Sequence, residues 1–138
     1  MKATFFIAAL IFFANISVAQ GDLELKIQNY EEDNGKIIIA VYNSADSFLK
    51  HPYKYEKLES TNESQTFRFT NLPKGNYAIK IYQDKNNDRT LNIGEYGDKE
   101  IYGFSNNQRS RIKSVSFSDI KFEVGSKELS SQIISLSK

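Results

Sequence analysis

The sequence contains no cysteine and no tryptophan, and only two prolines and one histidine occur among its 138 residues. Without cysteine the chain can form neither disulfide bonds nor the cysteine-linked lipid anchor of a bacterial lipoprotein. One histidine, His51, cannot by itself supply a zinc site or a nucleophile–base pair, and we expect it in an exposed loop. The folded chain must therefore rely on its own apolar core.

The sequence also lacks the motifs of common catalytic and nucleotide-binding sites. It has no Gly-x-Ser-x-Gly turn, no glycine-rich phosphate loop and no dinucleotide fingerprint. We therefore expect a protein that is not an enzyme. The alternative is a hydrolase that acts on surface glycans or peptides through carboxylates of the acidic loop described below, because two suitably spaced carboxylates can cleave a glycoside.

Only one long apolar run is present, and it lies at the N-terminus. Lys2 supplies a positive charge, residues 3–16 are almost wholly apolar, and Ser17-Val18-Ala19 precedes Gln20. This order is typical of an export signal that is cleaved after Ala19. The run of about 14 residues is shorter than the roughly 20 that a membrane-spanning helix needs. We therefore expect a signal peptide over residues 1–19 and one exported domain over residues 20–138, with a retained N-terminal anchor as the alternative.

Neither sign of charge is in excess. Without Lys2 the 18 basic residues become 17, which equals the number of acidic residues. Balanced charge gives no electrostatic reason to expect nucleic acid or an anionic membrane as a partner. We expect a periplasmic or extracellular protein, not inserted in the membrane after cleavage, whose partner is a protein, peptide or glycan that the sequence does not identify.

From Asp22 onward apolar and polar residues alternate, which is typical of strands with one buried face. The alternation predicts strands near residues 23–27, 36–43, 67–69, 77–81, 115–124 and 129–136, with a bulge or break near Ser118-Asp119. Asn34-Gly35 predicts a hairpin between the first two strands, residues 44–49 a short helical turn, and the polar run to Glu63 a long loop. Six or seven short strands without a long helix favour a Greek-key β-sandwich over a barrel.

The most specific chemical signal is the acidic loop, residues 84–95, which directly follows a predicted strand. Side chains with oxygen ligands fill its first, third, fifth, ninth and twelfth positions, and a backbone carbonyl is available at the seventh. These residues are Asp84, Asn86, Asp88, Asn92 and Glu95, with the carbonyl of Thr90. Calcium takes about six to eight oxygen ligands, so the spacing predicts a calcium site.

Several features of this loop leave alternatives open. The preceding strand excludes a helix–loop–helix EF-hand, and Asp98 or Glu100 could replace Glu95 as the last ligand. Arg89 occupies the sixth position, where glycine normally makes the sharp turn, and a left-handed arginine would cost roughly 1–2 kcal/mol. The alternative to a calcium site is a solvated turn, because Asp and Asn side chains also cap their own backbone.

Four segments together resemble the domain of unknown function 2141 family of small exported bacterial proteins. They are residues 35–43 (GKIIIAVYN), 69–79 (FTNLPKGNYAI), 84–88 (DKNND) and 100–107 (EIYGFSNN). The resemblance implies an export signal, an immunoglobulin-like or prealbumin-like sandwich of about seven strands, and no established activity. The sequence departs from the family pattern at Gln83, where histidine is common, at Arg89, where glycine is usual, and before Glu100, where proline is missing.

Two further groups of residues follow the acidic loop. The aromatic group could form a platform for a sugar or peptide or could pack the end of the sandwich. It comprises Tyr96, Tyr102 and Phe104. Arg109, Arg111 and Lys113 alternate, which predicts three cations on one strand face, either a solvated face or a protected edge. The leading interpretation is a non-catalytic binding or accessory module of the bacterial envelope with a calcium-braced loop.

Export is directly testable. Secretion by a bacterial host should remove residues 1–19, because the small residues before Gln20 suit signal peptidase. Mass spectrometry of the mature protein should therefore find Gln20 as the first residue. Intact Met1 on protein that only detergent releases would instead show an N-terminal anchor.

Overall fold

The computed structural model describes residues 17–61, 64–94 and 99–138, and the regular elements in this part of the chain are almost all strands. Its strands are β1 (Gln20–Gln28), β2 (Lys36–Tyr42), β3 (Lys54–Glu59), β4 (Ser64–Pro73), β5 (Gly75–Asp84), β6 (Tyr102–Phe104), β7 (Phe122–Val124) and β8 (Leu129–Ser135). A 3-10 turn, η1 (Ser105–Asn107), and one α-helical turn, α1 (Phe117–Ile120), complete the elements. In these ranges no helix is long and apolar enough to cross a membrane.

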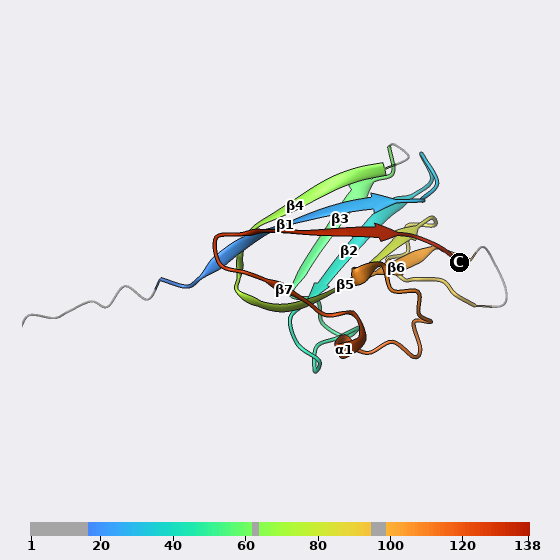
Figure 1. Cartoon of the computed structure of the whole chain (residues 1–138). Coiled ribbons are helices and arrows are strands. Elements are labelled where there is room, and N and C mark those ends of the chain that lie inside the picture. The colour runs from blue at the N-terminus through green and yellow to red at the C-terminus, as the bar shows by residue number, and fades with distance from the viewer. Residues whose placement is uncertain (1–16, 62–63, 95–98) are drawn as a thin grey trace, which may run out of the picture.

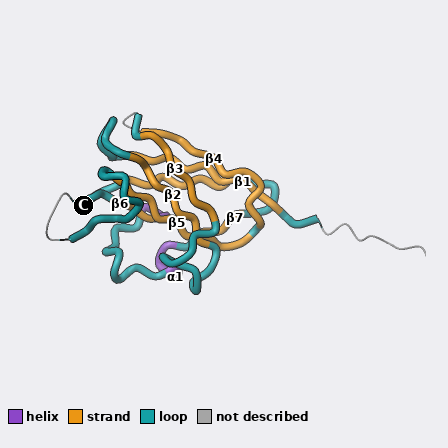
Figure 2. Tube along the Cα trace, turned by 180° about the vertical axis from the view of Figure 1, so that it is seen from behind, coloured by secondary structure: helices purple, strands orange, loops and turns teal. Residues whose placement is uncertain are grey.

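The eight strands form two sheets, which confirms the predicted all-β fold. One sheet has the order β4-β1-β8, and the other has the order β3-β2-β5-β6, with β7 also paired to β5. β1 runs antiparallel to β4 and parallel to β8. Figures 1 and 2 show β4 and β1 of the first sheet above β2 and β5 of the second, with α1 below β5.

The connection between β1 and β2 differs from the predicted hairpin. β1 pairs with β4 and β8, whereas β2 pairs with β3 and β5, so this loop carries the chain from one sheet to the other. Its left-handed residues are Asn29 (φ 67°), Asp33 (φ 53°) and Gly35 (φ 77°). A Cβ on Gly35 would collide with the backbone of Asp84 and Lys85, so the loop lies directly against the end of β5.

The predicted long loop before Glu63 contains a strand that the sequence pattern did not indicate. β3 pairs with β2 on one side and is an edge of its sheet. Its exposed side chains include Lys54, Lys57 and Glu59, and charged residues on an edge strand oppose pairing with other chains. This charge content explains why the segment is too polar to be recognised as a strand.

The segment 115–124 is not one bulged strand. Residues Phe117–Ile120 form α1, and only Phe122–Val124 forms a strand. Ser116 caps the helical turn: its backbone N–H and its hydroxyl donate to Asp119 Oδ2 at 2.7 and 2.8 Å. The change of apolar phase near Ser118-Asp119 therefore marks one turn of helix. At residues 44–50 the chain forms turns, in which Ser44 Oγ accepts a hydrogen bond from Ser47 N–H at 3.2 Å.

The main core lies between the two sheets, and a second apolar cluster covers the opposite face of β2 and β5. Ile37, Ile39 and Val41 belong to the main core, whereas Ala40 and Tyr42 belong to the second cluster. Successive side chains of a strand point to opposite faces, so β2 is buried on both sides. Residues of α1 and of the turns after β2 complete the second cluster, among them Phe48 and Ile120. Because both faces of β2 are buried, its sequence is a nearly continuous apolar run.

A buried serine bridges a gap in the edge of β5. β7 pairs with residues 75–77 of β5 and β6 with residues 80–82, which leaves the backbone N–H of Ile79 without a strand partner on that edge. This N–H donates to Ser105 Oγ at 3.0 Å, and the hydroxyl donates to the carbonyl of Ile120 at 2.6 Å. Ser105 has no exposed surface, so no water can replace it.

Replacement of Ser105 by alanine should therefore destabilise the domain. The change leaves a buried donor and a buried acceptor unpaired, which costs about 1–3 kcal/mol. Urea unfolding should show the loss, and Ser131→Ala, at an exposed position of β8, should change stability by less than about 0.5 kcal/mol. Equal stability of the two variants would contradict this role of Ser105.

Candidate ion-binding loop and an adjoining basic hollow

Asp84 folds the acidic loop back onto the end of β5. It is the last residue of the strand, and only 1% of its surface is exposed. Its Oδ1 accepts a hydrogen bond from the backbone N–H of Asp88 at 3.2 Å, and its Oδ2 accepts one from Arg89 at 2.9 Å. A single buried carboxylate thus determines where the loop turns.

Glu100 closes the other end of the loop. Only 2% of its surface is exposed, and its two oxygens accept the backbone N–H groups of Lys85 and Asn92, each at 2.9 Å. The N–H of Glu100 in turn donates to the carbonyl of Asn92 at 2.9 Å. Glu100 is one of the alternative last ligands that the sequence left open, whereas Glu95, the expected one, lies outside the described residues together with Asp98.

Asp88 links the remaining residues of the predicted ligand set. Its Oδ1 accepts the backbone N–H of Thr90 at 2.9 Å, and its Oδ2 accepts the side-chain amides of Asn86 at 3.1 Å and Asn92 at 3.2 Å. The Thr90 N–H, followed by the Asn92 amide, lowers the pKa of Asp88. Asp88 is exposed, so its carboxylate contacts solvent, whereas those of Asp84 and Glu100 are buried.

The structure brings three carboxylates to one point. Oxygen atoms of Asp84, Asp88 and Glu100 lie within 4.8 Å of one another. Calcium binds oxygen at about 2.3–2.6 Å, so two of its ligands can be separated by up to about 5 Å. Burial, followed by the negative charge of neighbouring groups including this cluster, raises the pKa of Tyr82. The donor set and its spacing fit a hard divalent cation.

Gln83 holds a second loop against the acidic loop. Its buried amide accepts the N–H of Glu31 at 2.9 Å and donates to the carbonyls of Glu31 and Asn34 at 2.6 and 2.5 Å. Lys85 forms an ion pair with Glu31 at 2.6 Å. The sequence did not predict this contact between the two loops. Its only signal was Gln83 itself, which stands where histidine is common in the family pattern.

The turn of the acidic loop uses two left-handed residues that are not glycine. Asn87 has φ 59° and Arg89 has φ 64°. Asparagine tolerates this conformation, but for arginine it is strained by roughly 1–2 kcal/mol. Arg89 therefore has the left-handed conformation that glycine normally provides at the sixth position of such a loop, and its side chain makes this conformation unfavourable.

The three alternating cations after η1 do not lie on a strand, contrary to the sequence expectation. They lie on the irregular segment between η1 and α1, and Arg111 and Lys113 line a cavity of about 880 Å³. Four of its nine lining residues are cationic: Lys99, Arg111, Lys113 and Lys138. Ile93, Tyr102 and Ile112 supply apolar surface. We call this cavity the basic hollow.

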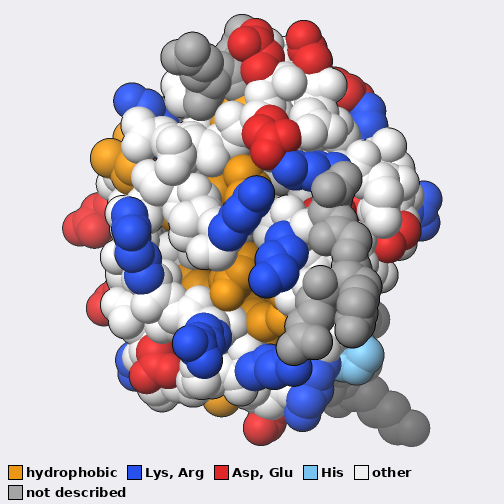
Figure 3. Space-filling view, turned by 90° about the vertical axis from the view of Figure 1, so that its right-hand side faces the viewer, with side chains coloured by type: hydrophobic (Ala, Val, Ile, Leu, Met, Phe, Trp, Pro, Cys, Tyr) orange, Lys and Arg blue, Asp and Glu red, His pale blue; other side chains and the backbone are white. Residues whose placement is uncertain are grey.

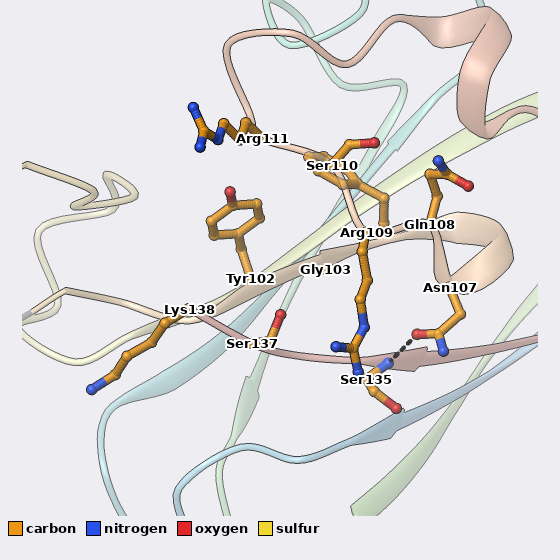
Figure 4. A pocket seen from close by; sticks show the side chains of 11 residues that line it. Tyr102, Gly103, Asn107, Gln108, Arg109, Ser110, Arg111, Ser135, Ser137 and Lys138 are labelled. Atoms are coloured by element: carbon orange, nitrogen blue, oxygen red, sulfur yellow. Dashed lines mark hydrogen bonds between the residues drawn. The ribbon is translucent and has the colours of Figure 1, made fainter.

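Figure 3 shows the molecule from the side on which the C-terminus lies in Figure 1. Lys and Arg side chains gather around hydrophobic ones on this side. A smaller cavity of about 290 Å³ shares Tyr102, Arg111 and Lys138 with the basic hollow, so the two adjoin. In Figure 4 Arg109 extends toward Ser135, whereas Arg111 and Lys138 extend on the side of Tyr102.

Of the two alternatives for the aromatic residues, packing describes Phe104, whereas Tyr102 faces the cavities. Phe104 is 1% exposed and packs edge-to-face against Tyr102, with ring centroids 5.6 Å apart. Tyr102 is half-buried and lines both cavities. Tyr96 lies outside the described residues. His51 is exposed, as predicted.

These features define a two-sheet β domain with a carboxylate-rich loop at the end of a central strand. The chain belongs to the family described as "Uncharacterized protein conserved in bacteria (DUF2141)", whose model matches residues 25–132. Neither the search of curated proteins nor the search of solved structures found a match.

The strain at Arg89 can be tested with a pair of variants. Arg89→Gly removes the left-handed penalty, whereas Arg89→Ala removes the side chain and keeps the penalty. The glycine variant should be more stable than the alanine variant by about 1 kcal/mol in urea unfolding, because the entropy of glycine in the unfolded chain offsets part of the gain. An alanine variant that is at least as stable would show that residue 89 is not held left-handed.

Proposed function

We propose that this protein is an exported, non-catalytic binding or accessory module of the bacterial envelope, whose acidic loop is braced by calcium. The observation that carries the calcium proposal is the convergence of Asp84, Asp88 and Glu100 within 4.8 Å, with two of the three buried. Asn86, Asn92 and the carbonyl of Thr90 would complete the ligand set predicted for the loop. In this proposal Glu100, which the sequence left open as an alternative to Glu95, is the closing ligand.

The physical reason for an ion is the charge that the loop concentrates. Neighbouring carboxylates favour protonation of one of their number unless a cation or hydrogen bonds compensate them. Backbone N–H groups compensate part of this charge, since each oxygen of Asp84 and Glu100 accepts one. An ionised carboxylate has about four lone-pair sites, so these hydrogen bonds leave room for a metal contact.

The same hydrogen bonds support a structural role for these groups over a catalytic one. A general acid or base must exchange its proton with a substrate, which requires that the substrate can reach it. Asp84 and Glu100 are buried, and both of their oxygens hold the loop. Export rests on the N-terminal signal pattern, and a periplasmic or extracellular location would supply calcium at concentrations that a weak site needs.

Calcium should stabilise the domain. Extracellular sites have dissociation constants on the order of 0.1–1 mM, so about 2 mM calcium should add roughly 0.6–1.8 kcal/mol. For a domain of this size each kcal/mol raises the melting temperature by about 2–8 °C, which differential scanning calorimetry resolves. Magnesium should have a smaller effect, because it requires octahedral geometry and loses its waters reluctantly.

Two asparagine variants sharpen the calcium experiment. Asp88→Asn removes one charge of the cluster at an exposed position, and Asp46→Asn removes a charge from the exposed turn after β2. Calcium should raise the melting temperature of the second variant as in the wild type and of the first much less. If the wild-type protein melts at the same temperature in calcium and in chelator, the loop is a solvated turn.

A further inference from the structure

The basic hollow, at about 880 Å³, is larger than the cavity of about 290 Å³ beside it, and most of its charged lining residues are cations. Among the described residues, its lining carries four cations and one carboxylate, Glu100. Both oxygens of Glu100 are engaged by backbone N–H groups of the acidic loop. The chain as a whole has nearly balanced charge, so this excess of cations is local. A concave surface lined by charge of one sign attracts ligands of the opposite sign.

Among the described residues, no ion pair involves a cation of the hollow. Between described residues the ion pairs join Lys36 to Glu59, Arg68 to Asp22 and Lys85 to Glu31. Lys99, Arg111, Lys113 and Lys138 take part in none of them, and all four are exposed. A guanidinium presents a fork of donors that matches a carboxylate, so Arg111 is the strongest candidate for direct recognition of an anion.

The size and the apolar surface of the hollow restrict the kind of anion. Its volume of about 880 Å³ is near the upper end of the roughly 300–1,000 Å³ typical of small-molecule sites. Ile93, Tyr102 and Ile112 add apolar surface, and the contact with Phe104 holds the Tyr102 ring in place. A ligand that fills this space therefore combines negative charge with a ring or other apolar face. A single small inorganic anion would leave most of the hollow empty.

The adjoining smaller cavity favours a ligand rich in hydroxyl groups. Six of its eleven lining residues carry a hydroxyl or amide side chain: Tyr102, Asn107, Gln108, Ser110, Ser135 and Ser137. Such groups can both donate and accept hydrogen bonds, as sugar hydroxyls do. An acyl chain would leave them unpaired. Because the cavities share Tyr102, Arg111 and Lys138, a ligand of several units can occupy both.

We propose that the basic hollow and the smaller cavity beside it bind an acidic oligosaccharide, with Arg111 paired to a sugar carboxylate and Tyr102 against a sugar ring. The inference rests on the binding-module part of the proposed function and names its ligand class. It does not depend on calcium in the acidic loop.

The test is a calorimetric titration of the protein, in chelator, with a short oligogalacturonate and with its neutral galactose counterpart. The acidic oligomer should bind at least about tenfold more tightly than the neutral one, because a charged hydrogen-bonded pair lost from a site costs about a factor of ten or more. Added salt should weaken the binding. The chelator keeps calcium from bridging the oligomer to the protein, so failure here is distinct from failure of the calcium proposal.

Two glutamine variants locate the site. Arg111→Gln should weaken binding about tenfold. Lys26→Gln removes the same charge from an exposed position of β1 in the other sheet and should change affinity less than twofold. Both positions are exposed, so both variants should melt as the wild type does. Equal losses in the two variants, or equal affinity for the neutral oligomer, would overturn the proposal.

Other ligand classes give distinct outcomes. Binding of polyglutamate or of vesicles with anionic lipid, without binding of oligogalacturonate, would overturn the saccharide assignment in favour of an acidic peptide or a membrane surface. The length of the bound oligomer should be unchanged after incubation. Shortened products that require Arg111 would support the ligand class and contradict the non-catalytic function.

Discussion

The rest of the structure depends on the backbone hydrogen bonding of β5. Its side chains from Tyr77 to Asp84 lie on two faces that are almost entirely buried, so each of its N–H and C=O groups needs a protein partner. β2 provides partners along one edge, while β6, Ser105 and β7 divide the other. The positions of β6, η1 and α1 follow from this requirement.

The same strand positions the acidic loop. β5 ends at Asp84, whose buried carboxylate accepts the N–H groups of Asp88 and Arg89, and Gln83 anchors the β1–β2 loop beside it. Gly35 allows that loop to approach the backbone of Asp84 without a side chain. The three carboxylates are therefore held by a fixed support, and an ion bound there would be braced by both loops.

Glu100 connects the acidic loop to the basic hollow. Its oxygens bind the backbone of the loop, and the same residue contributes to the lining of the cavity beside Tyr102 and Arg111. Negative charge on one side and positive charge on the other are thus separated by one buried side chain. This arrangement lets a chain of nearly balanced charge present two surfaces of opposite sign.

Alternation of apolar residues predicted most strands correctly, because a strand exposes its period of two in the local sequence. β3 was missed because an edge strand with charged side chains has the composition of a loop. β6 was missed because three residues are too few to show a period, and α1 because a single helical turn only shifts the phase of its neighbours. The ligand spacing identified the loop, and the loop pattern also anticipated the strain at Arg89.

The sequence by itself determined the all-β class, the family and the acidic loop, because each can be recognised from a local pattern of neighbouring residues. Only the tertiary structure decided that β1 and β2 belong to different sheets, that Glu100 closes the loop, and that Arg111 and Lys113 line a hollow instead of a strand face. Those outcomes depend on contacts between residues far apart in the chain, such as Gln83 with Glu31 and Ser105 with Ile79. Such contacts follow from the shared requirement to bury apolar surface and satisfy the backbone, which no local pattern expresses.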